Sequence, residues 1–224
     1  MKIHFAILLA SIFGLSSCQS ENIKTETKSS RVEYLPYYNS PDFTAHWFPP
    51  NSDSLKNFHS IPDFNLLNQL GDSVSQKDLQ GKIYIADFFF TTCPGICPKM
   101  TKNMQLVQQA FLEDDEIKIL SHSVTPSIDS VPVLKEYAQN QWVNSKSWFL
   151  LTGDRNTIYD LGRNAYFIEE DLGLERENFG SEFIHTENFV LVDKNHRLRG
   201  IYNGLNKASV NQLIADIKTL KEES

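Results

Sequence analysis

The sequence predicts an α/β fold in which helices flank a central mixed sheet, with an N-terminal extension and insertions. Residues 83–90 indicate the central strand, because they are apolar apart from Asp87 and show no alternation, as in strands covered on both faces. Helical patterns alternate with further apolar runs up to residue 164, which is typical of parallel strands joined by helices. After residue 188, two strand-like runs around a short turn indicate an antiparallel hairpin.

The elements are expected in a definite order. A strand-like piece at Ile61–Phe64 and a turn at 69–72 lead to a short helical turn ending at Leu79. The later elements follow from apolar spacing. After the central strand come a helix from 97 to about 113, a strand at 117–124, a helix after Pro132, a strand at 148–151 and a helix at 156–164. A polar loop at 169–182, a hairpin of 188–192 and 198–202, and a last helix over 210–220 complete the order. This order is that of a thioredoxin-like fold, whose site lies at the carboxyl end of a central strand.

Length and charge limit the classes of function. The chain has 224 residues, a formal net charge of -7, 41% hydrophobic residues and 22% charged residues, which is ordinary for one folded domain with appendages. It contains no run of lysine or arginine, so we expect no nucleic-acid partner and no attraction to anionic lipid surfaces. An acidic domain would instead steer toward basic partners.

Residues 1–17 are typical of a lipoprotein signal peptide. Lys2 supplies the positive charge, and the apolar run from Phe5 to Leu15 is too short to span a membrane. The run ends in Leu-Ser-Ser before Cys18, which resembles the bacterial lipobox, in which the cysteine is lipidated. We therefore expect a lipid anchor at Cys18 in the bacterial cell envelope, with the domain facing the periplasm. The alternative is an ordinary secretory cleavage site with an incidental cysteine.

The chain after Cys18 is expected to divide into a connection and a domain. Residues 18–40 form a flexible tether and the start of an N-terminal arm, and residues 41–222 form the thioredoxin-like domain. Aromatic residues and prolines gather between Tyr34 and Pro50, which is not the composition of a linker. This arm is expected to pack on the domain surface, with partner docking as the alternative.

Two thiols carry the expected chemistry. With Cys18 assigned to the anchor, Cys93 and Cys97 remain, and a pair four residues apart closes too small a loop to be an efficient structural disulfide. At the start of a helix, unpaired N–H groups stabilise thiolates, so both thiols are expected to be reactive near neutral pH. Such a pair can form a reversible disulfide or hold one soft ion; Cu(I) accepts a trigonal set of sulfur and imidazole, whereas structural zinc usually takes four ligands.

A copper site would need a third ligand. His185 stands before a strand, where a thioredoxin-like layout brings the chain across from the helix with the thiols, so it is the favoured candidate. His122 lies inside a strand and can be a packed, hydrogen-bonded imidazole. Met100 and Met104 have helical spacing; we expect them to fill the core, with copper ligation as the alternative.

Four segments resemble successive landmarks of the Sco/SenC family. They are Phe-Phe-Phe-Thr-Thr-Cys-Pro-Gly-Ile-Cys-Pro at 88–98, Ser-Val-Thr-Pro-Ser-Ile-Asp-Ser-Val-Pro at 123–132, Leu-Thr-Gly at 151–153 and His-Thr-Glu-Asn-Phe-Val-Leu-Val-Asp at 185–193. The resemblance spans about Ile61 to Tyr202. Two departures from the family pattern stand out: Thr125 replaces the usual aspartate of a Val-Asp-Pro loop, and Ile184 replaces the aspartate that often precedes the histidine. Each removes a carboxylate that could orient a ligand.

The resemblance implies both a site and a role. Members of the family are membrane-tethered, thioredoxin-like proteins that bind copper through two cysteines and a histidine, which correspond here to Cys93, Cys97 and His185. They help to assemble the dinuclear copper centre of cytochrome c oxidase. The implied partners are the copper-accepting subunit of the oxidase, other copper chaperones or thiol reductants, and the membrane through the lipid anchor.

A redox role is the main alternative, because Asp87 lies six residues before Cys93, the offset at which thioredoxins place a buried aspartate. Burial would raise the pKa of Asp87 and make it a proton acceptor for a thiol; an aspartate paired or hydrated near the strand end is the other interpretation. A metallochaperone with thiol-disulfide reductase activity would combine both roles. No proline adjoins His185 where thioredoxins place the substrate-binding cis-proline, which argues against a general oxidoreductase. A copper or redox sensor is a further alternative.

Overall fold

The computed structural model describes residue 30 and residues 32–168 and 186–223. The expected signal peptide, the anchor Cys18 and most of the tether lie outside these residues. So do the acidic loop at 169–182, Ile184 and the candidate ligand His185.

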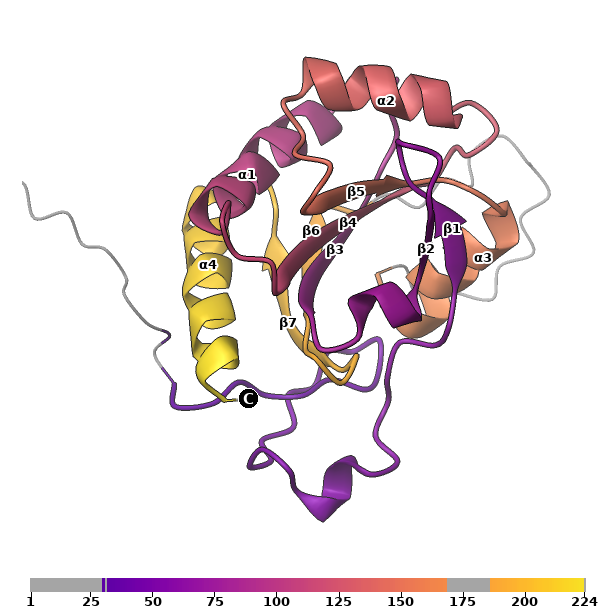
Figure 1. Ribbon diagram of the computed structural model, residues 1–224. Helices are drawn as coiled ribbons and strands as arrows, with labels where there is room; N and C mark the ends of the chain where they lie inside the picture. The colour runs from indigo at the N-terminus through magenta and orange to yellow at the C-terminus, as the bar shows by residue number, and fades with distance from the viewer. Residues whose placement is uncertain (1–29, 31, 169–185, 224) are drawn as a thin grey trace, which may run out of the picture.

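A five-stranded mixed sheet forms the centre of the molecule, in the order β5-β4-β3-β6-β7 (Figure 1). The parallel strands are β3 (Ile83–Phe89), β4 (Ile117–Ser123) and β5 (Trp148–Leu151), and the antiparallel hairpin is β6 (Asn188–Val192) with β7 (Leu198–Asn203). All seven residues of β3 are buried, which confirms the prediction of a central strand covered on both faces.

Helices cover both faces of this sheet. One apolar cluster joins the odd-numbered residues of β3 to α1 (Cys97–Ala110), α2 (Val131–Asn140) and α4 (Lys207–Glu222). A second cluster joins the even-numbered residues to α3 (Arg155–Asp160), which continues into a π-helical turn, η3 (Leu161–Ala165). The small sheet of β1 (Asn65–Leu67) and β2 (Ser73–Ser75) and the short helix η2 (Gln76–Leu79) cover the same side, and η1 (Asp53–Leu55) lies in the arm. These findings confirm the α/β, thioredoxin-like prediction.

Local differences from the expected elements have physical causes. The strand expected at Ile61–Phe64 begins only at Asn65; the earlier residues are held by burial and by a hydrogen bond from Ile61 N–H to the His196 carbonyl. The strand β2 was not expected, because two of its three residues are serine, and its pairing with β1 depends on a turn at Gly71 with a φ of 87°. Met100 and Met104 are 1% and 0% exposed, which supports their expected role as core residues.

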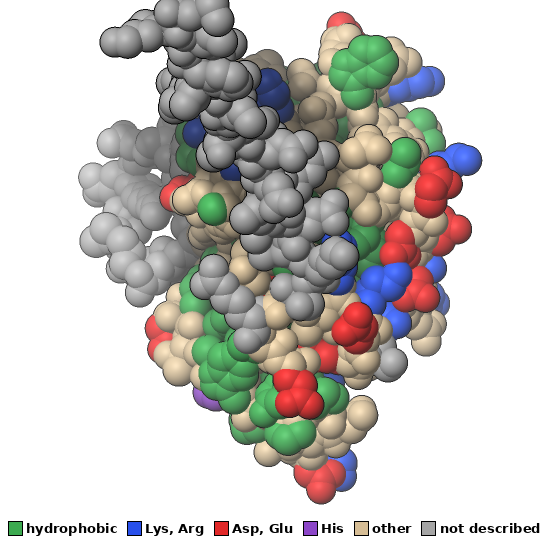
Figure 2. All heavy atoms as spheres, turned by 90° about the vertical axis from the view of Figure 1, so that its left-hand side faces the viewer, with side chains coloured by type: hydrophobic (Ala, Val, Ile, Leu, Met, Phe, Trp, Pro, Cys, Tyr) green, Lys and Arg blue, Asp and Glu red, His purple; other side chains and the backbone are tan. Residues whose placement is uncertain are grey.

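The N-terminal arm packs on the domain, as expected. Leu35 and Tyr37 are buried, Tyr37 pairs with His46, and Tyr38 pairs with Leu198 at the start of β7. The folded unit therefore takes in residues before 41. Figure 2 shows the neighbouring face, on which acidic and basic side chains of the described residues lie interspersed.

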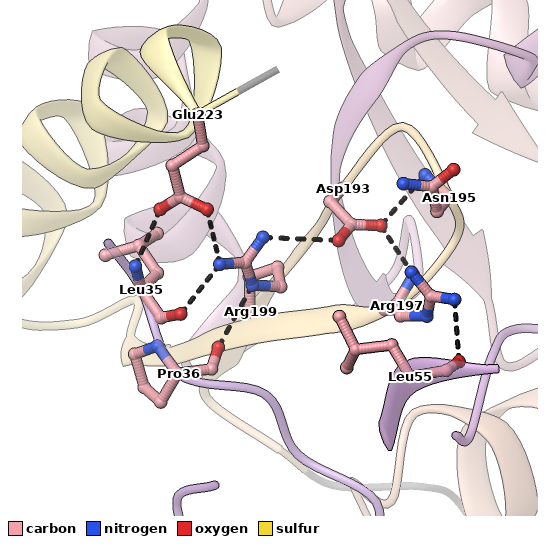
Figure 3. Close-up of polar contacts among 8 residues, drawn as sticks. All are labelled: Leu35, Pro36, Leu55, Asp193, Asn195, Arg197, Arg199 and Glu223. Carbon is pink, nitrogen blue, oxygen red and sulfur yellow. Dashed lines mark hydrogen bonds and ion pairs between the residues drawn. The ribbon is translucent and has the colours of Figure 1, made fainter. Parts of the chain in front are cut away.

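Arg199 on β7 holds this arm in place (Figure 3). Its guanidinium is 3% exposed and lies between the carboxylates of Asp193, at 3.3 Å, and Glu223, at 2.6 Å. It also donates to the carbonyls of Leu35, at 2.7 Å, and Pro36, at 3.1 Å. Glu223 in turn accepts from the Leu35 N–H. The arm, the β6–β7 hairpin and the end of α4 are thus joined through one buried cation.

Candidate functional site

The two thiols lie where β3 gives way to α1. Cys97 is the first residue of the helix and is buried, whereas Cys93 precedes the helix in a turn and is partly exposed. Both cysteines are free, and the Cys97 thiol donates a hydrogen bond to the Cys93 sulfur. The two sulfurs therefore meet across the start of α1.

This geometry gives the two thiols different acidities. Partial burial alone would raise the pKa of Cys93, but hydrogen bonds from the Cys97 thiol and from the backbone N–H groups of Cys97, Gly95 and Ile96 lower it below its ordinary value. Burial and the proton shared with Cys93 raise the pKa of Cys97 to about 12. The expectation that both thiols are reactive near neutral pH is therefore wrong for Cys97, because only Cys93 receives the N–H groups of the helix start.

An apolar pocket of about 290 Å³ opens beside the thiols. Its described lining consists of Phe88, Phe89, Phe90, Cys93, Pro94, Gly95, Ile96, Cys97 and Thr186. The lining thus combines the end of β3 with the thiol turn. A ligand or partner group that approaches the Cys93 sulfur through this pocket is transferred from water to apolar surroundings. Its electrostatic interaction with the sulfur is stronger there than in water.

Asp87 lies on the face of β3 that carries the thiols. It is 3% exposed, and it accepts a hydrogen bond of 2.5 Å from Ser121 Oγ, which in turn accepts one of 2.8 Å from Trp148 Nε1. Burial raises the pKa of Asp87 to about 7, and the Ser121 hydrogen bond only partly offsets this shift. When Asp87 is ionised, its charge raises the pKa of Cys97. Asp87 is therefore buried with a raised pKa, as expected, and it is hydrogen-bonded to Ser121, while its role as a proton acceptor stays a prediction.

His122 lies on the opposite side of the sheet. Its ring stacks on Phe88 with centroids 4.9 Å apart, is fully buried, and makes no hydrogen bond to the described residues through either nitrogen. Burial lowers the pKa of His122 to about 4. The sheet separates this imidazole from Cys97, so the two cannot share an ion. His122 is packed, as expected, but without the expected hydrogen bond.

A further carboxylate beside the thiol turn escaped the sequence analysis. Asp129 is 0% exposed and accepts hydrogen bonds from Ser123, Thr125 and Thr91. Thr125, noted above as a departure, thus lies within a cluster that does contain a carboxylate. The signal in the sequence was faint: Ser121 and Ser123 follow Ile117 and Ile119 on one face of the strand at 117–124.

Clusters of potential metal ligands and helices that could span a membrane are both absent from the described residues. They contain no group of three or more His, Cys, Asp or Glu side chains that could enclose a metal ion. The predicted third ligand, His185, lies outside the described residues. Over the same described stretches, no helix is both long and apolar enough to cross a membrane.

Comparison with known proteins gives a consistent result. The family model described as SCO1/SenC matches residues 52–222. A SCO1/SenC family lipoprotein from Bacillus anthracis str. Ames shares 31% identity, with a TM-score of 0.64 over 73% of this chain and 95% of that one. BsSco, described as a member of the Sco family of cytochrome c oxidase assembly proteins with a disulfide switch, shares 30% identity, with a TM-score of 0.63 over 73% of this chain and 94% of that one.

A more distant structure has the same fold. ScoI from Bradyrhizobium japonicum, solved with copper bound, is 24% identical, with a TM-score of 0.56 over 72% of this chain and 99% of that one. At this level of identity the likeness concerns the fold alone.

Proposed function

This chain belongs to the SCO1/SenC family, and we propose that it is an exported, lipid-anchored protein that binds a copper ion and helps to assemble the dinuclear copper centre of cytochrome c oxidase. The observation that carries the proposal is the pair of free thiols at the β3–α1 junction, one of them with a lowered pKa, beside an apolar pocket. The proposed ligands are Cys93, Cys97 and His185. The proposed partners are the copper-accepting subunit of the oxidase and other copper chaperones or thiol reductants.

The chemistry of the thiols fits this cargo. Cu(I) prefers soft sulfur ligands and low coordination numbers, and two sulfurs that already share a proton are close enough to share an ion. Thiolates, not thiols, bind the metal, so copper must displace the proton of Cys97. Because the pKa of Cys97 is about 12, binding releases this proton at neutral pH, and the copper affinity rises with pH.

The anchoring part of the proposal rests on the sequence before the domain. Residues 1–17 would be removed as a lipoprotein signal peptide, Cys18 would carry the lipid, and the domain would face the periplasm of the bacterial cell envelope. The described relative from Bacillus anthracis, itself called a lipoprotein, supports this arrangement.

Anaerobic competition titration with Cu(I) tests the ligand set. The reduced protein is expected to bind one Cu(I) per chain. Cys93→Ser, Cys97→Ser and His185→Ala should each weaken the binding. The loss should be roughly a hundredfold or more for each cysteine, because a sulfur ligand is removed. Met104→Leu is the matched control, since this buried core sulfur should not contribute. Tight stoichiometric binding that survives loss of both Cys93 and Cys97 would refute the site.

A thiol-disulfide reductase is the second candidate function, and the buried Asp87 beside the thiol cluster favours it. The Cys93 thiolate would attack a disulfide of the copper-accepting subunit, forming a mixed disulfide and releasing one acceptor thiolate. Asp87 would take the Cys97 proton, and the Cys97 sulfur would then attack the Cys93 sulfur, closing the Cys93–Cys97 disulfide and releasing the second acceptor thiol. Two electrons pass from the cysteine pair to the acceptor. One acceptor sulfur takes the Cys97 proton from Asp87, and the other leaves as a thiolate and takes a proton from the solvent.

Reduction of an acceptor disulfide by the reduced protein tests this second function. Asp87→Asn is expected to slow the reaction roughly a hundredfold, because the proton acceptor is lost. Asp154→Asn, a change at an exposed helix cap, is the control and should leave the rate unchanged. A wild-type rate no faster than that of a free dithiol would exclude the reductase.

A further inference from the structure

We infer that Asp129 is a positioning residue for the thiol turn, acting through Thr91. This inference deepens the proposed function and rests on it, because it concerns how the same two thiols are held. Asp129 lies 32 residues beyond Cys97 in the sequence and touches neither sulfur. Its influence would pass along hydrogen bonds to the backbone that leads into Cys93.

Among the described residues, the buried carboxylate of Asp129 has no cationic partner. It takes part in none of the ion pairs among the described residues. Instead its oxygens accept from Ser123 Oγ at 2.5 Å, Thr125 Oγ1 at 3.0 Å, Thr91 Oγ1 at 2.5 Å and the Thr91 N–H at 3.3 Å. Burying a carboxylate costs desolvation free energy, which its hydrogen bonds must offset. Such a group in a turn that apolar residues could fill therefore points to a role for those hydrogen bonds in holding the neighbouring backbone.

Rigid elements hold this carboxylate in place. Ser123 is the last residue of β4, and the turn after it is closed by a hydrogen bond of 2.9 Å from Asp129 N–H to the Thr125 carbonyl. Immediately after Asp129, Ser130 precedes the first residue of α2. Asp129 is therefore fixed by the end of a central strand and the start of a helix, and neither can move without disturbing the core.

The thiol turn is the segment that receives this constraint. Just before it, the Phe89 carbonyl accepts from Val124 N–H at 2.9 Å, and just after, Cys93 N–H donates to the Phe90 carbonyl at 3.3 Å. Thr91 lies between these two points, and both its N–H and its hydroxyl bond to Asp129. These two hydrogen bonds fix the orientation of the backbone that leads into Cys93. They thereby position the Cys93 sulfur toward the N–H groups at the start of the helix.

Variants at Thr91 test the inference with little risk to the fold. Thr91→Val keeps the side-chain shape and removes the hydroxyl, whereas Thr91→Ser keeps the hydroxyl. Thr91→Val is expected to weaken Cu(I) binding about tenfold, as loss of an orienting hydrogen bond does at metal sites. It should also shift the Cys93–Cys97 dithiol–disulfide equilibrium in glutathione buffers about tenfold toward the disulfide, or about 30 mV, because the aligned dithiol is destabilised. Thr91→Ser should restore both values.

Ser123→Ala separates positioning from stability. It removes an equally short hydrogen bond to the same carboxylate but no contact with the thiol turn. It should lower the free energy of unfolding and change copper affinity and the disulfide equilibrium clearly less than Thr91→Val does, because the bonds between Asp129 and Thr91 remain. Adding Thr91→Val to Asp129→Asn should have little further effect, because both act along one path.

Two results would overturn the inference: wild-type behaviour of Thr91→Val in both measurements, or an equal change in Ser123→Ala. If the wild-type protein fails to bind Cu(I), the proposed function fails. The disulfide equilibrium then still decides the role of Asp129.

Discussion

Replacing Arg199 by methionine is expected to lower the free energy of unfolding by about 4 kcal/mol, because it leaves buried carboxylates without their cation. Methionine fills a similar volume, but Asp193 and Glu223 lose the charge between them. The carbonyls of Leu35 and Pro36 lose their donors as well. Denaturant unfolding followed by circular dichroism measures the change. Limited proteolysis should cut the arm of the variant much faster than that of the wild type.

Lys56→Met is the matched control for Arg199. Lys56 also pairs with a carboxylate, that of Asp53 at 2.8 Å, but the two side chains are 75% and 89% exposed. Such exposed pairs contribute about 0–1 kcal/mol, so unfolding should hardly change. If Arg199→Met were as mild as Lys56→Met, the arm would not depend on the buried cation.

Two buried titratable groups are expected to give the stability opposite dependences on pH. The pKa of Asp87 rises from 3.8 to about 7 on folding, so between these values the folded state holds a proton that the unfolded state has lost, and stability falls as pH rises. The pKa of His122 falls from 6.5 to about 4, so in that window the unfolded state holds the extra proton, and stability falls as pH falls. Between about pH 4 and 6.5 the two slopes largely cancel.

Replacing one of the two groups at a time reveals how that group's titration changes the free energy of unfolding with pH. Relative to wild type, Asp87→Asn should gain about 4 kcal/mol of stability as pH rises from 4 to 7, because asparagine does not ionise. His122→Phe should gain about 3 kcal/mol relative to wild type as pH falls from 6.5 to 4. The measurement is the difference in unfolding free energy between variant and wild type across pH. A difference that stays constant with pH would show that the group titrates alike in both states.

The strands and helices that the sequence revealed are those with strong apolar periodicity. The continuous apolar run at 83–90 predicted a covered strand, and the four- and three-residue spacing after Cys97 predicted a packed helix, and both are observed. The β1–β2 pair was hidden because its strands have three residues each, with polar side chains at Asn65, Ser73 and Ser75. Tertiary contacts, rather than local pattern, decide such short strands.

Spacing and position singled out Cys93, Cys97 and Asp87, which the structure places at the end of β3 and the start of α1, whereas the predicted ligand His185 lies outside the described residues. The asymmetry of the thiols could not be foreseen, because it depends on which sulfur the helix N–H groups face. The Asp129 cluster was equally hidden, since hydrogen bonds between residues 38 positions apart leave no periodic trace.

The register of the sheet places the attachment of the N-terminal arm and the thiol turn at opposite ends of β3. Tyr84, near the start of β3, pairs with Val192, so Asp193 and Arg199 lie at the edge where β3 begins, whereas the thiol turn follows its far end (Figure 1). Seven residues of strand separate these edges by roughly 20 Å. Tension on the chain before residue 30 would thus load the Arg199 cluster and leave the thiol turn unstrained. Under the proposed anchoring at Cys18, a pull on the tether would therefore be borne at the end of the sheet opposite the thiols.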